Sequence, residues 1–309
     1  FYSSPVSENR NPQSLFFLHK EFAMNNLIPQ LPHRDADSHK GTFGTTFIIG
    51  GCKGMSGAMV LCGTAALKSG AGLVQIGTPT SIRSEIAIGN PCYTTIGLPE
   101  DDEGRFNQQA IKQISQFAGR ASAVVLGPGA APTKACKEMA DYLLGLETPV
   151  LLDADALNSL ASDGFPTAFK NKQVVITPHP GEFSRLTRLT AKEIQSDRKT
   201  LAMNFALSHG IIVVLKGHGT VVSDGKSVYI NATGNAGMAT GGSGDVLSGI
   251  IGALLGQGMQ AFDAAKLGVY LHGLAGDHAK KQLGEHSLTA LDILEHIPSA
   301  FLFHEKALA

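Results

Sequence analysis

The sequence contains no Trp, and aromatic residues make up only 6% of its 309 positions. This scarcity argues against an aromatic stacking surface for single-stranded nucleic acid. The formal net charge is only −1, so bulk charge would attract neither nucleic acid nor an anionic membrane. We therefore expect a small-molecule partner, with no nucleic acid and no membrane.

Cysteine patterns and long apolar runs are also lacking. Cys52, Cys62, Cys92 and Cys136 include no Cys-x-x-Cys pair and no His at metal-ligand spacing, so we expect four reduced thiols. No apolar run reaches the roughly 18 residues that cross a bilayer, and the first residues do not form a secretory signal. The cytoplasm is therefore the expected location.

The first 40 residues differ from the rest. They are polar, contain four prolines and have no periodic pattern, except for a short helix predicted around residues 15–25. We expect residues 1–40 to form a polar N-terminal extension. Residues 41–309 contain no convincing linker, so they are expected to form a single domain.

Short apolar runs alternate with helical stretches from residue 45 onward. Six runs are rich in Val and Ile and apolar on both faces, as buried parallel strands are: TFIIG (46–50), GLVQIG (72–77), AVVLG (123–127), PVLLD (149–153), QVVIT (173–177) and IIVVLKG (211–217). Helices are predicted at 56–69, 108–118, 133–146 and 191–208, the last opened by a capping box of Thr190 and Glu193.

An Asp224-Gly225 pair in TVVSDGKSVYI (220–230) predicts a hairpin with a two-residue turn. Beyond Asp245 the chain reads as wholly helical. The pattern predicts an α/β, doubly wound, mostly parallel central sheet with helices on both faces and one antiparallel hairpin.

Ligands of such sheets bind beyond the carboxyl ends of the strands, where many of the 36 glycines lie. The turn from Gly50 to Ala58 fits neither a phosphate loop nor a dinucleotide fingerprint. It would either admit a ligand close to the backbone or be a plain tight turn, and the same alternatives hold for Gly127-Pro128-Gly129. Asp153, Asp155 and Asn158 would either hold Mg²⁺ through water or cap the following helix.

Two further strand ends carry polar residues. Pro178-His179-Pro180-Gly181-Glu182 fixes a His between two prolines, which suits the presentation of its ring or backbone to a ligand, and Pro180 suits the first turn of a helix. Lys216-Gly217-His218-Gly219-Thr220 offers a cation and two glycines, which suit a nucleotide or phosphate. A structural His and a solvated Lys are the alternatives.

The strongest candidate is Asp245 in NAGMATGGSGDVLSG. Gly241, Gly242 and Gly244 let successive N–H groups converge, and the helix that starts near Asp245 adds positive potential. Together they predict an anion hole for phosphate. We expect the same field to keep Asp245 ionised and therefore a poor base by pKa, but still able to accept a proton as a hydroxyl attacks a phosphoryl group. The alternative role, a helix N-terminal charge, would not require the glycines.

Longer motifs occur together in one order and cover nearly all of residues 41–298. They are KGTFGTTFIIGGCKGMSGAMVLCGTAALKSGAGLV, VVLGPG, PVLLDADALN, ITPHPGE, VVLKGHGTVV and NAGMATGGSGDVLSGIIGALL, followed by HGLAGDHA and ALDIL. The sequence thereby resembles the ADP/ATP-dependent NAD(P)H-hydrate dehydratase family. The resemblance implies a ribokinase-like fold.

The resemblance also implies an activity. Members restore NADH or NADPH from the (6S) hydrates while ADP or ATP is split in the presence of Mg²⁺. The ring hydroxyl would be phosphorylated, with Asp245 as its base, and phosphate would then be eliminated. Members often carry a preceding epimerase domain, which residues 1–40 are too short to form, so we expect no epimerase activity. A homo-oligomer, such as a tetramer, is expected.

Site residues follow from the matching motifs. Those that would contact the hydrate are Ala58, Gly129, His179 and Asp245. Those that would bind the adenine nucleotide are Lys216, Gly217, His218, Gly219, Thr220, Gly241, Gly242, Ser243 and Gly244. No metal ligand is assigned.

Two competing functions use the same pocket. A ribokinase-like kinase of a vitamin precursor would release a stable phosphoester, and a non-catalytic sensor would bind nucleotide without turnover.

Overall fold

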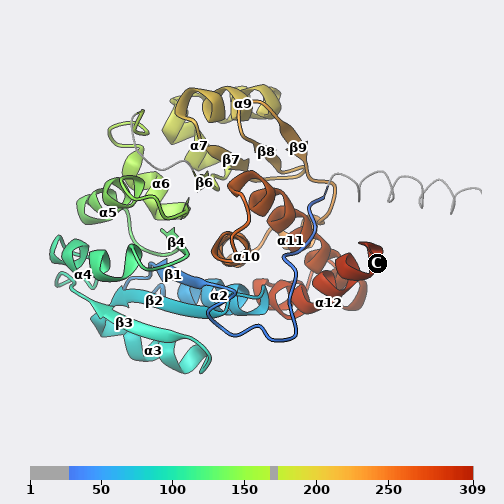
Figure 1. Ribbon diagram of the computed structural model, residues 1–309. Helices are drawn as coiled ribbons and strands as arrows, with labels where there is room; N and C mark the ends of the chain where they lie inside the picture. Colours follow the sequence, from blue (N-terminus) through green and yellow to red (C-terminus); the bar gives the residue numbers. More distant parts are fainter. Residues whose placement is uncertain (1–27, 168–172, 309) are drawn as a thin grey trace, which may run out of the picture.

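The computed structural model describes residues 28–167 and 173–308. Its centre is a nine-stranded sheet in the order β3-β2-β1-β4-β5-β6-β7-β8-β9. Helices cover both faces of the sheet (Figure 1). A separate cluster of buried apolar side chains lies between the sheet and the helices on each face. The predicted fold class is confirmed.

Seven strands run parallel and the last two form the antiparallel hairpin. They are β1 (Thr45–Ile49), β2 (Leu73–Pro79), β3 (Thr94–Leu98), β4 (Ala123–Leu126), β5 (Val150–Leu152), β6 (Val174–Ile176), β7 (Ile212–Leu215), β8 (Val221–Ser223) and β9 (Val228–Ile230). All six strands predicted from apolar runs are present. Strand β3 was missed because it lies at the sheet edge, where only Leu98 is buried and the apolar signal is weak.

The α-helices of the described residues are α2 (Ser56–Lys68), α3 (Arg83–Gly89), α4 (Gln109–Ala118), α5 (Lys134–Leu144), α6 (Ala154–Leu160), α7 (Pro180–Thr187), α8 (Ala191–Ser196), α9 (Arg198–His209), α10 (Ser243–Gly256), α11 (Ala261–Leu283) and α12 (Ala290–Leu308). The helix predicted over 191–208 is two helices. Asp197 separates them because its carboxylate accepts a hydrogen bond from the Thr200 N–H and caps α9. The region beyond Asp245 is helical but broken twice, between α10, α11 and α12.

The hairpin turns one residue later than predicted. Ser223 pairs with Val228, and the Asp224 N–H lies 3.4 Å from the Ser227 oxygen. The chain therefore reverses at Gly225 and Lys226, and Gly225 has a φ of +87°. Asp224 stabilises this turn because its carboxylate accepts hydrogen bonds from two N–H groups beyond it.

Helix α10 is buried from Val246 to Gly256 and packs against α2. A Cβ at Gly249 would lie 2.2 Å from the Cys62 oxygen, so only glycine permits this close approach. The packing holds the first turn of α10, with Asp245, at the carboxyl-end edge of the sheet.

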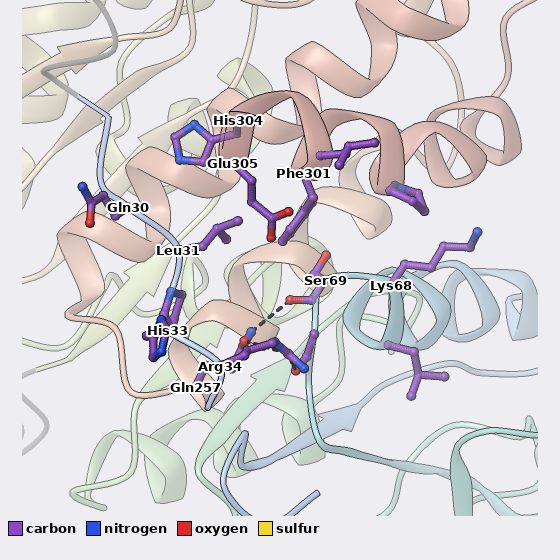
Figure 2. Close-up of a pocket in the computed structure, with 15 residues that line it drawn as sticks. Gln30, Leu31, His33, Arg34, Lys68, Ser69, Gln257, Phe301, His304 and Glu305 are labelled. Carbon is purple, nitrogen blue, oxygen red and sulfur yellow. Dashed lines mark hydrogen bonds between the residues drawn. The ribbon is translucent and has the colours of Figure 1, made fainter. Parts of the chain in front are cut away.

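Residues 28–34 cross the other end of α10. Ile28 is buried in the core, and Pro29 offers its carbonyl oxygen to His304 Nε2 at 2.9 Å. Arg34 donates to the carbonyl oxygen of Gly70 and to Oε1 of Gln257, beyond the ends of α2 and α10 (Figure 2). The helix predicted at 15–25 lies outside the described residues, and the division at residue 40 stays a prediction.

A cavity of about 630 Å³ lies between residues 30–34, the end of α2 and α12 (Figure 2). Its lining includes the apolar side chains of Leu31 and Phe301 and the charged side chains of Arg34 and Glu305. Gln257, the C-cap of α10, also lines the cavity. The cavity is therefore about 20 Å from Asp245, the length of α10, and separate from the strand-end residues.

Candidate functional site

The carboxyl ends of β5, β6 and β7 and the start of α10 meet around one ion pair. Lys216, which follows β7, places its Nζ 2.8 Å from Oδ1 of Asp153, which follows β5. Ser248 of α10 donates to the other oxygen of Asp153 at 2.8 Å. Both oxygens of this buried carboxylate are therefore occupied, and its side chain makes no cap to α6.

Lys216 remains a cation despite its burial. Burial alone would lower the pKa of the ammonium group, but the carboxylates of Asp153 and Glu182 raise its pKa above the ordinary value. Its Nζ lies 3.9 Å from Oε2 of Glu182. The ammonium group of Lys216 therefore faces two acidic side chains, Asp153 and Glu182.

Asp245 sits in the first turn of α10. Its pKa is raised to about 7, first by burial and then by the carboxylate of Asp153, while Lys216 opposes the shift. The expectation that Asp245 stays firmly ionised was wrong, because burial among acidic neighbours outweighs the field of the helix N-terminus. An aspartate with a pKa near 7 is well matched to proton transfer at neutral pH.

The glycines before Asp245 differ in what they do. Gly242 is the N-cap of α10 with a φ of +87°, and a Cβ on Gly244 would lie 3.3 Å from Lys216 Nζ. Gly241 is exposed, and a Cβ there would meet nothing within 4 Å. The N–H groups of Gly244 and Asp245 have no acceptor in the described residues, as expected in a first helical turn. These two N–H groups are available to an anion.

Ser243 makes a different contact. Its hydroxyl lies 3.4 Å from Nε2 of His272 on α11. Burial lowers the pKa of His272 to about 4, so this ring is neutral at physiological pH.

His179 forms the N-cap of α7 together with Glu182. The His179 Nδ1 accepts a hydrogen bond from the Gly181 N–H, and Glu182 accepts one from the His179 N–H at 2.7 Å. Burial lowers the pKa of His179. It also raises the pKa of the buried Glu182 to about 7, against the charge of Lys216. The ring is thus fixed in place, half exposed, with Pro180 at the start of the helix as expected.

Ala58 and Gly129 are neighbours. A Cβ on Gly129 would lie 3.2 Å from the Ala58 Cβ, and Gly129 has a φ of +62°. The turn after β4 is tied to α6 because Asp155 accepts a hydrogen bond from the Ala131 N–H at 3.0 Å. Asn158 donates to the other oxygen of Asp155 at 3.2 Å, so these two polar residues support a turn.

The loop from Lys216 to Thr220 turns sharply at two glycines. Gly217 has a φ of +138° and Gly219 of +61°, and the Thr220 hydroxyl donates to the Gly217 oxygen at 2.9 Å. His218 is exposed. Arg198 on α9 donates to carbonyl oxygens of this loop; sequence reasoning missed it, since its partners are distant in sequence.

Within the described residues, no three His, Cys, Asp or Glu side chains are grouped so as to hold a metal ion. The same residues include no helix that is both long and apolar enough to span a bilayer. All four cysteines are free thiols, as expected.

Comparisons with known proteins agree with one another. The model of the NAD(P)H-hydrate dehydratase family matches residues 46–299. The bifunctional NAD(P)H-hydrate repair enzyme Nnr of Moorella thermoacetica is 42% identical over 87% of this chain and 51% of its own length. The chain therefore spans about half the length of such bifunctional relatives. The ADP-dependent (S)-NAD(P)H-hydrate dehydratase of Neisseria meningitidis serogroup B is 40% identical over 82% of this chain and 85% of its own.

Solved structures give the same result. The ADP/ATP-dependent NAD(P)H-hydrate dehydratase of Bacillus subtilis, co-crystallized with ATP/Mg²⁺, has a TM-score of 0.79 and 31% identity, and the match covers 92% of this chain and 97% of that one. A ribokinase of Thermotoga maritima shares only the fold, with a TM-score of 0.50 and 16% identity over 84% of this chain and 99% of its own. The fold is ribokinase-like.

Proposed function

The chain belongs to the NAD(P)H-hydrate dehydratase family, and from this membership and the strand-end geometry we propose that it dehydrates the (6S) hydrate of NADH or NADPH. ADP or ATP would be the phosphoryl donor. The observation that carries the proposal is Asp245, a partly buried aspartate with a pKa of about 7 next to unpaired N–H groups at the start of α10. The carboxylate of Asp245 and the N–H groups at the start of α10 thus place a base beside a site for an anion.

The two substrates would meet over Asp245. We propose that Ala58, Gly129 and His179 contact the hydrate, since Ala58 and Gly129 are adjacent and the His179 ring is held in place. The nucleotide would lie along the loop from Lys216 to Thr220 and the turn from Gly241 to Gly244. Lys216 supports this placement because its charge lies beside Gly244, where phosphate would approach the first turn of α10.

Phosphorylation would turn a poor leaving group into a good one. Asp245 would accept the proton of the ring hydroxyl while that oxygen attacks the terminal phosphorus and the nucleotide leaves with the electrons of the broken P–O bond. The ring nitrogen would then supply the electron pair that expels phosphate from the ring carbon. Loss of a proton from the adjacent ring carbon would restore the double bond of the reduced nicotinamide.

The site fits a magnesium ion that arrives on the nucleotide. Asp153, Asp155 and Glu182 all raise the pKa of Asp245, so several acidic groups gather beside Lys216. Mg²⁺ needs only one or two carboxylates when phosphates supply other ligands. Each carboxylate oxygen of Asp153 and Asp155 accepts only one hydrogen bond from the described residues, so these side chains would hold the ion through its water with their remaining lone pairs. When bound, it would neutralise phosphate charge.

Beyond the site, we propose a cytoplasmic homo-oligomer. Support comes from exposed apolar side chains on α12: Leu291, Leu302 and Phe303 are 58%, 51% and 45% exposed. Single exposed apolar residues are common, but several on one helix favour a contact surface.

Product analysis tests the proposed activity. The protein is incubated with the (6S) hydrate of NADH, Mg²⁺ and either ADP or ATP, and reduced nicotinamide, free phosphate and phosphorylated intermediates are followed together. We expect reduced nicotinamide and phosphate in equal amounts. An accumulating phosphoester would favour the kinase, and nucleotide binding without turnover of either hydrate would favour the sensor.

A further inference from the structure

Arg198, the first residue of α9, lies against the loop that follows β7. Its two terminal nitrogens donate to three carbonyl oxygens, one at the end of β7 and two in this loop. The acceptors are Leu215 at 2.7 Å, Lys216 at 3.1 Å and His218 at 2.5 Å. One rigid guanidinium group therefore fixes the direction of three peptide groups.

The opposite edges of two of these peptide groups face away from Arg198, whereas the N–H of the third, that of Lys216, donates to the Pro178 oxygen at 2.9 Å. In a planar trans peptide the N–H points away from the preceding carbonyl oxygen. Since the oxygens of Lys216 and His218 turn toward Arg198, the N–H groups of Gly217 and Gly219 point to the other side. Neither N–H has an acceptor among the described residues, so both are available to an anion.

The lack of a side chain at Gly217 allows Arg198 to approach the loop closely. Gly217 has a φ of +138°, and a Cβ at this position would lie 3.1 Å from Nη2 and 3.3 Å from Cζ of Arg198. A side chain at 217 would push the loop and the guanidinium apart. The close contact therefore depends on both residues.

The charge of Arg198 is not balanced by the chain. Burial lowers its pKa, its Nε is buried without an acceptor, and no carboxylate in the described ranges forms an ion pair with it. Such a cation is costly to bury unless an anion approaches.

We propose that Arg198 is a positioning residue for the phosphate groups of the adenine nucleotide. Its hydrogen bonds keep the carbonyl oxygens of Lys216 and His218 on the side of α9, so that the N–H groups of Gly217 and Gly219 face the nucleotide. This inference rests on the proposed function, in which the same loop binds ADP or ATP.

Direct binding tests this role without any need for turnover. The dissociation constants of ADP and ATP are measured by calorimetry, in Mg²⁺ and without hydrate, for wild type, Arg198→Met, Arg198→Lys and Gly217→Ala. The control is Lys199→Met, which removes an exposed positive charge from the next residue of the same helix.

We expect Arg198→Met to weaken nucleotide binding about tenfold or more, since hydrogen bonds from a charged group are lost. Arg198→Lys should recover only part of the loss, because a single ammonium group cannot hold three carbonyls. Lys199→Met should bind as wild type does. With saturating nucleotide, the KM for the hydrate should stay within about threefold of wild type.

A double-variant cycle separates positioning from general stability. If Arg198 acts through the loop, Arg198→Met with Gly217→Ala should bind no more weakly than the worse single variant. Wild-type affinity in Arg198→Met would overturn the inference, as would fully additive losses. If Arg198→Met does not fold, Arg198→Lys decides, and wild-type affinity there would overturn it. Nucleotide binding by wild type without dehydration would instead contradict the proposed function.

Discussion

Burial decides the chemistry of Asp245. A helix N-terminus favours an ionised aspartate by about 0.3–1 kcal/mol, whereas burial and the neighbouring Asp153 raise the pKa to about 7. The sequence could predict where Asp245 lies, since glycines precede it and an apolar helix follows. It could not predict the sign of the shift, because Asp153, after β5, and Glu182, in α7, are far away in the sequence.

This pKa predicts the pH dependence of catalysis. A raised acid pKa means that Asp245 is protonated below pH 7 and can accept a proton only above it. We therefore expect kcat/KM, measured across buffers of constant ionic strength, to rise with pH through an apparent pKa near 7.

Glu182 also has a pKa of about 7, and its carboxylate contributes to the raised pKa of Asp245, so its own titration would fall in the same pH range. The variant Glu182→Gln removes the titration of Glu182 and leaves that of Asp245. Its kcat/KM should still rise with pH. A kcat/KM that stays flat down to about pH 5 in both proteins would contradict the role of Asp245.

At the scale of elements, the apolar runs predicted six strands because buried parallel strands are apolar on both faces, and the Asp224-Gly225 pair predicted the hairpin. The edge strand β3 lacks that signal, and one N-cap, Asp197, divides a helix that periodicity treated as continuous. The loop after β7 was predicted as a nucleotide contact, but its support by Arg198 depends on α9 lying against β7, which no local pattern encodes.

The start of α10 gives a matched pair of glycine substitutions. Gly242→Ala should destabilise the protein by about 1–3 kcal/mol, since φ is +87° and the new Cβ would lie 2.5 Å from Leu61 Cδ1. Gly241→Ala should be neutral within about 0.5 kcal/mol, since a Cβ there meets nothing within 4 Å. Denaturant unfolding and ADP titration measure both variants. Equal effects of the two substitutions would mean that the turn does not depend on the conformation of Gly242.

At the scale of the whole molecule, the parallel sheet explains why distant motifs act together. Asp153, His179 and Lys216 follow three neighbouring strands, β5, β6 and β7, and so meet at one edge. Open α/β sheets bind their ligands at this edge. The sequence allowed the site to be predicted as a set of strand ends, whereas the ion pair of Lys216 with Asp153 required the structure.

Assembly is the prediction that concerns the whole chain. If the exposed side chains of α12 form a contact between copies, the mass in solution should be a multiple of 32.4 kDa. Light scattering coupled to size exclusion measures it across a range of concentrations. A single species of 32.4 kDa at every concentration would contradict the homo-oligomer.

Turnover by Asp245→Asn tests the central claim most directly. The variant keeps the shape of the side chain but cannot accept the hydroxyl proton, so we predict a kcat lower by about a hundredfold or more with the hydrate of NADH, Mg²⁺ and ADP or ATP. Asp263→Asn is the matched control, because Asp263 also lies in a first helical turn, that of α11, and its side chain is 47% exposed. It should turn over as wild type does. Turnover by Asp245→Asn within about tenfold of wild type would contradict the account.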